Sequence, residues 1–169
     1  MSIKIYQLKN YFVTEQNGVW KQMNGKTVSN DIETIKGDAK KIANVLRDNN
    51  KGYHERLEKD DVLTLFCDLD GIASKKSRIT LKLNVFKEQI KEFFYIQFRK
   101  RITRITITEN KGYSKESKFG SFHVFFPEFS MTSSYQKEFW KEFSEEYNYK
   151  NNEIDVGIYG CSKCRFSQQ

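Results

Sequence analysis

Apolar residues recur at spacings of three and four positions in three segments of the chain, which is the pattern of amphipathic helices. We expect one helix from Asp31 to about Arg56, capped by Asn30 or Asp31, a second over residues 85–98 and a third over residues 135–147. In the third segment an aromatic residue recurs every four positions, so one face of this helix should be buried.

Other segments alternate apolar and polar residues or form short β-branched runs, as strands do. Gly71 is expected to end the first strand and Pro127 the third. This order of elements predicts an α+β or α/β domain with a mixed sheet. The expected strands cover residues 62–67, 101–109 and 121–126, with a last short strand near Ile154.

The chain is expected to fold as a single domain over residues 1–169. Its hydrophobic content of 38% is enough for a core, and no Ser/Gly-rich linker separates two parts. The amino terminus lacks the apolar stretch of a signal peptide, and no run approaches the roughly 18 apolar residues of a membrane span. We therefore expect an intracellular, soluble protein with no membrane partner, in the nucleus or the cytoplasm.

Two aspartates, Asp68 and Asp70, follow the apolar run VLTLFC. Because side chains at positions i and i+2 of a strand share a face, both carboxylates should project together at the carboxyl end of the strand, with Cys67 on the other face. Adjacent carboxylates repel unless a cation lies between them, and Mg²⁺ prefers oxygen ligands. The pair therefore indicates a divalent metal site; the alternative is a solvated pair in a turn.

Ser121 and His123 in SFHVFFP should share one face of their strand, opposite Phe122, Val124 and Phe126. A histidine with a neighbouring hydroxyl can donate hydrogen bonds to phosphate oxygens, although a packed or surface histidine is the alternative. A Ser-His-Asp triad is not expected, because two residues on one strand do not place the hydroxyl against the imidazole as base catalysis requires.

Asp155 in EIDVGIYG is a candidate third carboxylate, and three carboxylates can hold two metal ions. Lys163 and Arg165 follow closely and could bind a triphosphate, or they could be free surface cations. Nearby, Cys161 and Cys164 form a C-x-x-C without two clear further ligands, so neither structural zinc nor a disulfide is expected.

The net charge of +7 is concentrated in the middle of the chain, where residues 71–120 hold 13 basic against 4 acidic residues, a difference of +9. Such a segment suits a polyanionic partner through counterion release, whereas the alternative is a solvated face of a lysine-rich protein. Tyr113 or Phe119 could stack on bases there. The candidate nucleic-acid contacts are Lys75, Lys76, Arg78, Arg99, Lys100, Arg101, Arg104, Lys111, Lys115 and Lys118.

The order of these segments resembles the three motifs of archaeo-eukaryotic primases, including primase-polymerases. In that family a strand with hydrophobic-D-x-D is followed by a strand with S-x-H, and then by hydrophobic-D, a tyrosine and basic residues. The stretch FGSFHVFFP…IDVGIYG…RF is most similar to the primases of large nucleocytoplasmic DNA viruses and related mobile elements. The resemblance spans roughly residues 60–166.

This resemblance implies the primase catalytic core, in which an amino-terminal α/β part packs on an RRM-like part with flanking helices. It implies that Asp68, Asp70 and Asp155 are catalytic and bind two Mg²⁺ or Mn²⁺ ions. Ser121, His123 and a basic residue after the third motif, Arg165 in preference to Lys163, would hold the incoming NTP or dNTP. The implied reaction is template-directed nucleotidyl transfer on single-stranded DNA, with a helicase or another replication subunit as partner.

The chain ends a few residues after the third motif, earlier than the family usually does, so three interpretations stay open: a primase domain truncated at its carboxyl end, a minimal primase and a degenerate relative. Two alternatives to an active enzyme stay open. One is a catalytically weak or inactive primase-like subunit that binds nucleic acid in a replication or modification complex. The other is an RRM-like RNA-binding module, which predicts exposed aromatic residues on the strands and nucleotide binding that does not depend on a divalent metal.

Overall fold

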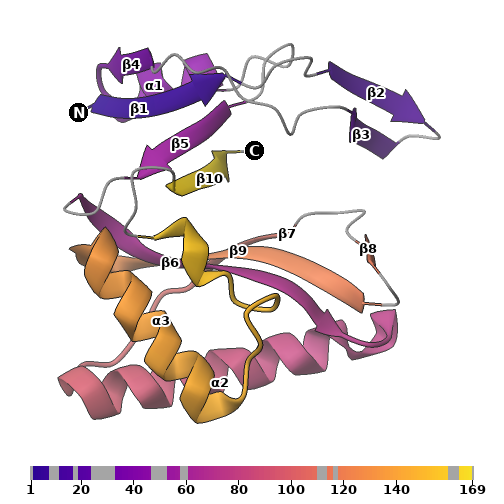
Figure 1. Cartoon of the computed structure of the whole chain (residues 1–169), viewed down its shortest axis with the longest axis vertical. Coiled ribbons are helices and arrows are strands. Elements are labelled where there is room, and N and C mark those ends of the chain that lie inside the picture. Colours follow the sequence, from indigo (N-terminus) through magenta and orange to yellow (C-terminus); the bar gives the residue numbers. More distant parts are fainter. Residues whose placement is uncertain are drawn as a thin grey trace. The chain divides into compact units, whose positions relative to one another are not determined.

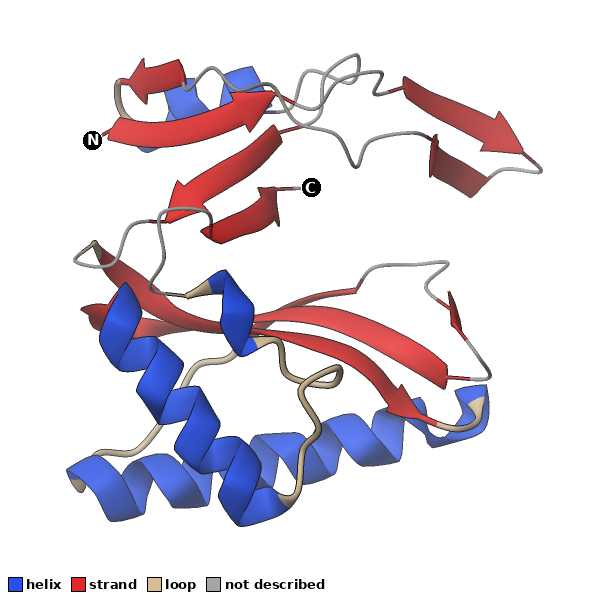
Figure 2. Ribbon diagram, viewed as in Figure 1, coloured by secondary structure: helices blue, strands red, loops and turns tan. Residues whose placement is uncertain are grey.

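The computed structural model divides the chain into two compact units, which are described separately (Figures 1 and 2). Unit 1 comprises Met1–Glu58 and Cys161–Gln169, and unit 2 comprises Lys59–Gly160. The single domain over residues 1–169 stays a prediction. The structure describes residues 2–7, 12–16, 19–23, 33–46, 53–57, 61–109, 114–115, 118–159 and 164–168.

Unit 1 contains a four-stranded sheet in the order β10–β5–β1–β4, the hairpin β2–β3 and the helix α1. Each described pairing in it is antiparallel. Its buried hydrophobic residues include Ile5, Ile42, Tyr53 and Leu57. The elements are β1 (Ser2–Gln7), β2 (Phe12–Gln16), β3 (Val19–Met23), β4 (Glu33–Lys36), α1 (Ala39–Leu46), β5 (Tyr53–Leu57) and β10 (Cys164–Gln168).

The long helix expected from Asp31 to about Arg56 is wrong in its extent, because β4 precedes α1 and β5 follows it. Gly37 separates β4 from α1 with a φ of 151°, a backbone angle that glycine adopts without the steric cost of a side chain. Asp38 takes the capping role that was expected of Asn30 or Asp31, two residues outside the described ranges. Its carboxylate accepts a hydrogen bond of 2.8 Å from the backbone N–H of Lys41.

Unit 2 is built on a sheet in the order β6–β9–β7, with β8 also paired to β9, and every described pairing is antiparallel. The α+β class is confirmed, but the expected mixed sheet is wrong for the described strands. The helix between β6 and β7 returns the chain in the same direction, yet β9 lies between these two strands and runs against both. The strands are β6 (Val62–Ala73), β7 (Thr106–Glu109), β8 (Ser114–Lys115) and β9 (Lys118–Thr132).

The strand expected over residues 101–109 is shortened to β7, and the strand expected near Ile154 is a single bridge to Leu69. Before β7, the backbone N–H groups of Thr103 and Arg104 each donate to the carboxylate of Glu128 at 2.8 Å, so they are not available to a ladder. The bridge adds residues 153–154 to the edge of β6 that does not face β9. Apart from the two-residue strand β8 and two short 3-10 helices, unit 2 therefore has the element order strand, helix, strand, strand, helix, bridge.

Two helices cover one face of this sheet, α2 (Ile79–Phe98) and α3 (Ser133–Tyr147), as Figure 2 shows. Both were expected, although α2 begins earlier, at Ile79. Thr132 caps α3 by accepting a hydrogen bond of 3.2 Å from the N–H of Tyr135. Aromatic side chains fill the space between helices and sheet, with edge-to-face contacts such as Phe93 to Phe139 at 5.3 Å. The buried rings include Phe86, Phe93, Phe94, Phe126, Phe139, Trp140 and Phe143.

Both long strands continue past the residues expected to end them. Gly71 has a φ of 59° and lies in a register shift between Asp70 and Ala73, so β6 passes it as a bulge and the aspartates lie inside the strand. Pro127 lies in a second shift, because Phe126 pairs with Leu65 whereas Ser130 pairs with Thr64. A bulge needs no ladder N–H from the proline, which is why the strand tolerates it.

Gln136 of α3 stabilises this second bulge through side-chain hydrogen bonds to β6. Its side chain is fully buried; the amide nitrogen donates to the carbonyl oxygens of Leu63 and Thr64 at 3.0 and 3.2 Å, and the amide oxygen accepts from the N–H of Phe66 at 3.2 Å. Backbone groups that the shifted register leaves without ladder partners are therefore satisfied by one side chain.

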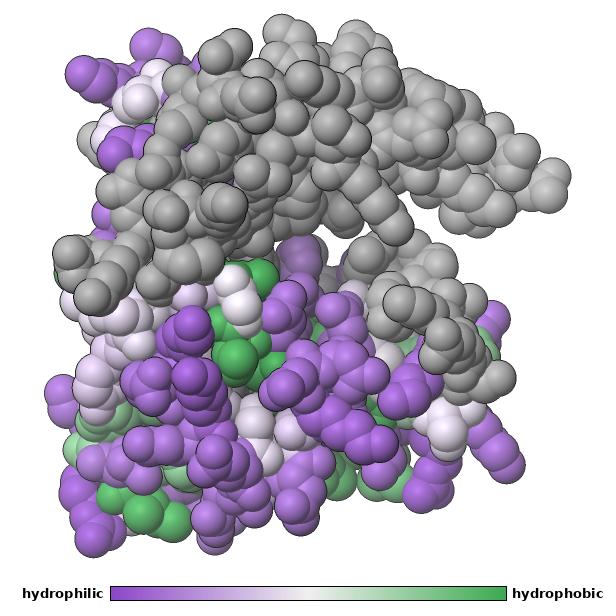
Figure 3. All heavy atoms as spheres, in the orientation of Figure 1, coloured by the Kyte–Doolittle hydropathy of each residue, from purple (hydrophilic) through white to green (hydrophobic). Residues whose placement is uncertain are grey.

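The described surface of unit 2 that is visible in Figure 3 is mainly hydrophilic, with hydrophobic residues in small patches. Large hydrophobic side chains that are exposed include Val62, Leu81, Val85 and Ile96. No helix within the described ranges is long and apolar enough to cross a membrane.

Candidate active site

One face of the β6–β9 pair packs against the helices and the other carries the polar motif residues. Leu65 and Phe126 pair with each other, are 0% exposed, and Phe126 lies 6.0 Å from Trp140 of α3, so this is the helix-covered face. Cys67 is two residues from Leu65 and is also fully buried. Asp68 and Asp70 therefore lie on the opposite face from Cys67, as the alternation of a strand predicts.

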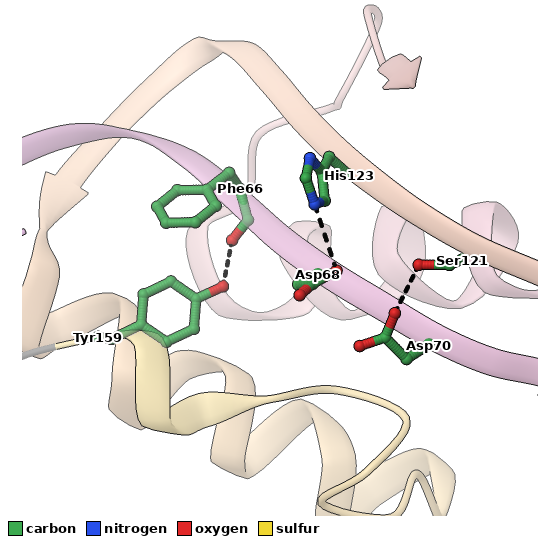
Figure 4. Close-up of polar contacts among 6 residues, drawn as sticks. All are labelled: Phe66, Asp68, Asp70, Ser121, His123 and Tyr159. Carbon is green, nitrogen blue, oxygen red and sulfur yellow. Dashed lines mark hydrogen bonds and ion pairs between the residues drawn. The ribbon is translucent and has the colours of Figure 1, made fainter. Parts of the chain in front are cut away.

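The register of the two strands joins the first two motifs (Figure 4). Asp68 is paired with His123, and Asp70 is paired with Ser121. Paired residues in an antiparallel ladder project from the same face, so four polar side chains from segments about 50 residues apart form one cluster. We call these four residues, together with Asp155, the acidic cluster.

Asp68 is the most perturbed member of the acidic cluster. Its side chain is 20% exposed, and its Oδ1 is buried with no hydrogen-bond partner among the described residues. Burial, and then the nearby charges of Asp70 and Asp155, raise the pKa of Asp68 to about 7. A carboxylate that lacks partners and faces two like charges is strained in its charged form.

His123 lies close to this oxygen, with Nε2 at 3.7 Å from Asp68 Oδ1. The distance suits an ion pair, but burial lowers the pKa of His123 while the charge of Asp70 raises it less. Burial favours the neutral form of both groups, so the contact joins a neutral His123 imidazole to an Asp68 carboxyl group that is readily protonated. A neutral imidazole retains one ring N–H that can donate.

Asp70 is held by Ser121, whose hydroxyl donates to Asp70 Oδ1 at 2.6 Å (Figure 4). Ser121 is 3% exposed, so its only hydroxyl proton is used inside the protein. The sequence predicts that Ser121 holds a nucleotide phosphate. In this arrangement it fixes the orientation of Asp70 instead, and the phosphate role stays a prediction.

Asp155 reaches the cluster along the free edge of β6. The bridge between Leu69 and Ile154, and a hydrogen bond of 2.9 Å from Asp70 N to Glu153 O, place Asp155 beside Asp68. Its charge is one of the causes of the raised pKa of Asp68. The side chain of Asp155 is exposed and its Oδ1 accepts a 2.8 Å hydrogen bond from Gly157 N, which caps the short helix η2 (Val156–Ile158).

Tyr159 anchors the segment that carries Asp155. It is fully buried, its hydroxyl donates to the carbonyl oxygen of Phe66 at 2.5 Å, and the two rings lie 5.1 Å apart (Figure 4). Sequence reasoning gave Tyr159 no role beyond the motif in which it stands. No local signal in the sequence predicts this contact, because Phe66 and Tyr159 are 93 residues apart.

The carboxylates of the acidic cluster do not converge on one point in this structure. Among the described residues no three His, Cys, Asp or Glu side chains are already gathered around one ion position. One oxygen of Asp70 and one of Asp155 are engaged in the local hydrogen bonds described above, which explains why the carboxylates do not converge. The buried, unpartnered oxygen of Asp68 and the two neighbouring carboxylates nevertheless fit a hard divalent cation, which would satisfy that oxygen and offset the repulsion.

The predicted triphosphate contacts lie elsewhere in the chain. Lys163 lies outside the described residues, and Arg165 is in β10 of unit 1. Of the C-x-x-C, Cys161 lies outside the described residues and Cys164 is the first residue of β10. The roles of Lys163 and Arg165, and the expectation that there is no zinc site, stay predictions.

The predicted nucleic-acid contacts do not form one patch, because α2 separates them. Lys75, Lys76 and Arg78 lie at its beginning, where Lys76 and Arg78 bound the short helix η1 (Lys76–Arg78). Lys118 and Phe119 begin β9, next to this end, and Lys115 lies in β8. Arg99, Lys100, Arg101 and Arg104 follow the other end of α2, which is about 30 Å away for a helix of 20 residues. Lys111 and Tyr113 lie outside the described residues.

No protein-family model, no curated protein and no solved structure matches the chain. Any function assigned to the acidic cluster therefore depends on its own geometry and chemistry.

Proposed function

We propose that the chain is a metal-dependent nucleotidyl transferase of the primase type, which joins NTPs or dNTPs on a single-stranded DNA template. The observation that carries this proposal is the row formed by Asp155, Asp68 and His123 across three adjacent segments of one sheet face. The three motifs of the resemblance are far apart in the sequence. If the match of these motifs to the family were accidental, there would be no reason for their residues to lie side by side on one face of the sheet.

The topology of unit 2 gives a second, independent line of support. Its strand, helix, strand, strand, helix, bridge order, with the bridge segment and β9 on either side of β6, is the β-α-β-β-α-β arrangement of ferredoxin-like and RRM-like folds. The resemblance to primases implies an RRM-like part with flanking helices, and residues 61–159 have the matching order of elements.

In the proposed reaction the 3′-oxygen of the growing strand forms a bond to the α-phosphorus of the incoming nucleotide, the bond to pyrophosphate breaks, and the hydroxyl proton passes to solvent. Two Mg²⁺ or Mn²⁺ ions, when bound, would activate this hydroxyl and offset charge on the leaving group. Asp68, Asp70 and Asp155 would hold them. His123, neutral and beside Asp68, would donate its ring N–H to a phosphate oxygen, while Ser121 orients Asp70.

The same face argues against an RRM-like RNA-binding module. Such a module stacks bases on aromatic side chains of its central strands. Here the central positions of β6 and β9 carry Asp68, Asp70, Ser121 and His123, and without a bound metal the carboxylates would repel an RNA backbone. Two aromatic residues share this face: Phe66 is covered by Tyr159 and only 4% exposed, and Phe125 packs against Phe66 with 6.1 Å between ring centres and is half-buried.

Primer synthesis tests the proposal. The purified chain with single-stranded template, NTPs or dNTPs and Mn²⁺ should make short oligonucleotides, and Asp68→Asn should reduce the product to background. Glu109→Gln, which removes an exposed carboxylate from β7 of the same sheet, is the matched control and should leave synthesis intact. Synthesis that survives Asp68→Asn would refute the metal-binding role of the cluster.

A catalytically weak nucleic-acid-binding subunit is the second candidate. It is favoured by the hydrogen bonds that occupy Asp70 and Asp155 and keep the carboxylates apart. This alternative predicts that the unmodified chain makes no oligonucleotide with either class of nucleotide, yet binds single-stranded DNA with an affinity that Mn²⁺ does not change.

A further inference from the structure

The basic residues at the beginning of α2 form a charged group that is separate from the acidic cluster. Between Asp70 and Glu88 the sequence contains five basic residues and no acidic one. Three of the five, Lys75, Lys76 and Arg78, are exposed and surround η1, and Lys118 lies close by at the start of β9. Together with Phe119 these four cations are called the η1 cluster.

Within the part of the chain that the structure describes, no cation of the η1 cluster forms an ion pair with a carboxylate. The first turn of α2 contains no acidic residue either. The positive end of a helix dipole disfavours cations at this position, so folding alone gives no reason for them. At the far end of α2, by contrast, Arg99 and Arg101 lie where the dipole favours cations, and Arg104 has Glu128 as a neighbour.

Phe119 gives the η1 cluster an aromatic member. It is partly exposed, and the ammonium group of Lys76 lies 5.7 Å from the centre of its ring. An aromatic ring next to exposed cations is the combination that binds single strands, since bases stack on the ring while phosphates contact the cations. Double-stranded DNA presents no unstacked base to such a ring.

The η1 cluster also lies next to the acidic cluster along the same two strands. Phe119 pairs with Ala73, and Ser121 pairs with Asp70. Only Gly71 and Ile72 lie between Asp70 and Ala73, so the two clusters are at most about 10 Å apart along β6. The cations that follow the far end of α2 lie about 30 Å from the η1 cluster, at the opposite end of unit 2 in Figure 1.

We propose that the η1 cluster binds the phosphates of a single DNA strand and stacks one of its bases on Phe119, so that this strand enters the acidic cluster from the Asp70 side. The proposal rests on the proposed function, because it assigns the template to one of the two basic groups. The basic residues after α2 then have no direct role in binding the strand.

The test compares two variants that remove the same charge from the two ends of one helix. The first is Lys75→Gln with Lys76→Gln and Arg78→Gln, and the matched control is Arg99→Gln with Lys100→Gln and Arg101→Gln. Binding of a fluorescent 20-nucleotide oligo(dT) is measured by anisotropy in EDTA at several salt concentrations. Circular dichroism and the urea midpoint establish that both variants fold.

The first variant should bind the oligonucleotide at least tenfold more weakly, and the slope of log K against log salt should fall by about 2, as expected for three lost contacts with phosphates of a single strand. The control should lose less than threefold. Phe119→Leu should weaken oligo(dT) binding by at least about fivefold without changing the salt slope, because stacking carries no charge.

Equal losses in the two charge variants would overturn the proposal, since binding would then follow net charge alone. Tighter binding of a duplex of equal length, or of polyglutamate, would overturn it in favour of another polyanion. These measurements contain no metal, so they do not depend on catalysis. If the chain fails to make primers but binds oligo(dT) through the η1 cluster, the proposed enzyme is refuted and this inference is supported. If the first variant makes primers at the unmodified rate, the proposed enzyme is supported and this inference is refuted.

Discussion

Replacing Asp68 by asparagine should stabilise the metal-free protein at alkaline pH. In the folded chain the carboxyl group of Asp68 is partly buried, its Oδ1 has no hydrogen-bond partner among the described residues, and two further carboxylates lie nearby. Its charged form is therefore disfavoured by folding. Asparagine has nearly the same shape and carries no charge, so the substitution removes the repulsion and leaves the packing in place.

The magnitude follows from the pKa. Folding raises the pKa of Asp68 from 3.8 to about 7, so between these two values the folded chain binds more protons than the unfolded chain. Stability then falls as pH rises, by about 1.4 kcal/mol for each pH unit, and the loss is complete above pH 7 at about 4 kcal/mol. Between pH 5 and pH 8, the free energy of unfolding should therefore fall by about 3 kcal/mol because of Asp68.

Urea unfolding in EDTA at pH 5, 7 and 8 measures this difference. The free energy of unfolding of the unmodified chain should decline relative to that of Asp68→Asn as pH rises, and the variant should be the more stable protein at pH 8. Glu109→Gln should follow the unmodified chain throughout. Added Mn²⁺ at pH 8 should stabilise the unmodified chain and not Asp68→Asn, because a ligand that binds only the folded state raises its stability.

A variant that is less stable than the unmodified chain at pH 8 would refute this reasoning. Asp68 would then be a structural residue whose charge is satisfied in the folded protein. The main argument for a cation at the acidic cluster would then no longer hold.

Three further substitutions test other contacts of the site. Tyr159→Phe removes the hydrogen bond to Phe66 O and should lower the free energy of unfolding by about 1–2 kcal/mol, read from the urea midpoint. Gln136→Leu leaves buried backbone groups at the bulge without partners and should cost about 2–3 kcal/mol in the same assay. Ser121→Ala should lower kcat of primer synthesis about tenfold with little change in KM if the hydroxyl orients Asp70, whereas a raised KM would indicate that it binds the nucleotide.

The sequence predicted the helices of unit 2 better than its strands. The aromatic spacing in α2 and α3 reflects local packing on one face, so it could be read directly. Gly71 and Pro127 were taken as strand ends because both usually disrupt a ladder. Bulges accommodate them here, and whether a bulge forms depends on the partner strand, which neither segment reveals alone. The bulge at Pro127 depends in addition on Gln136, which is 72 residues from Thr64, one of the residues that it bonds in β6.

For the candidate site, alternation along each strand predicted which side chains share a face, and the structure agrees for Asp68 with Asp70 and for Ser121 with His123. The register that pairs the two motifs was not predictable, because β7 and a loop intervene between α2 and β9. The nucleic-acid role of the charged stretch stays a prediction, but its residues do not lie together. Basic residues that a count over residues 71–120 groups together lie at opposite ends of α2.

Two features of unit 2 work against its own stability, and they lie side by side on β6 and its continuation. One is the buried oxygen of Asp68 among carboxylates. The other is the group of cations at the amino-terminal end of α2, which form no ion pair with a carboxylate among the described residues. Folding explains neither, and a separate structural reason would be needed for each. The proposed function would account for both together, because a bound metal would offset the carboxylates and the phosphates of a bound strand would offset the cations.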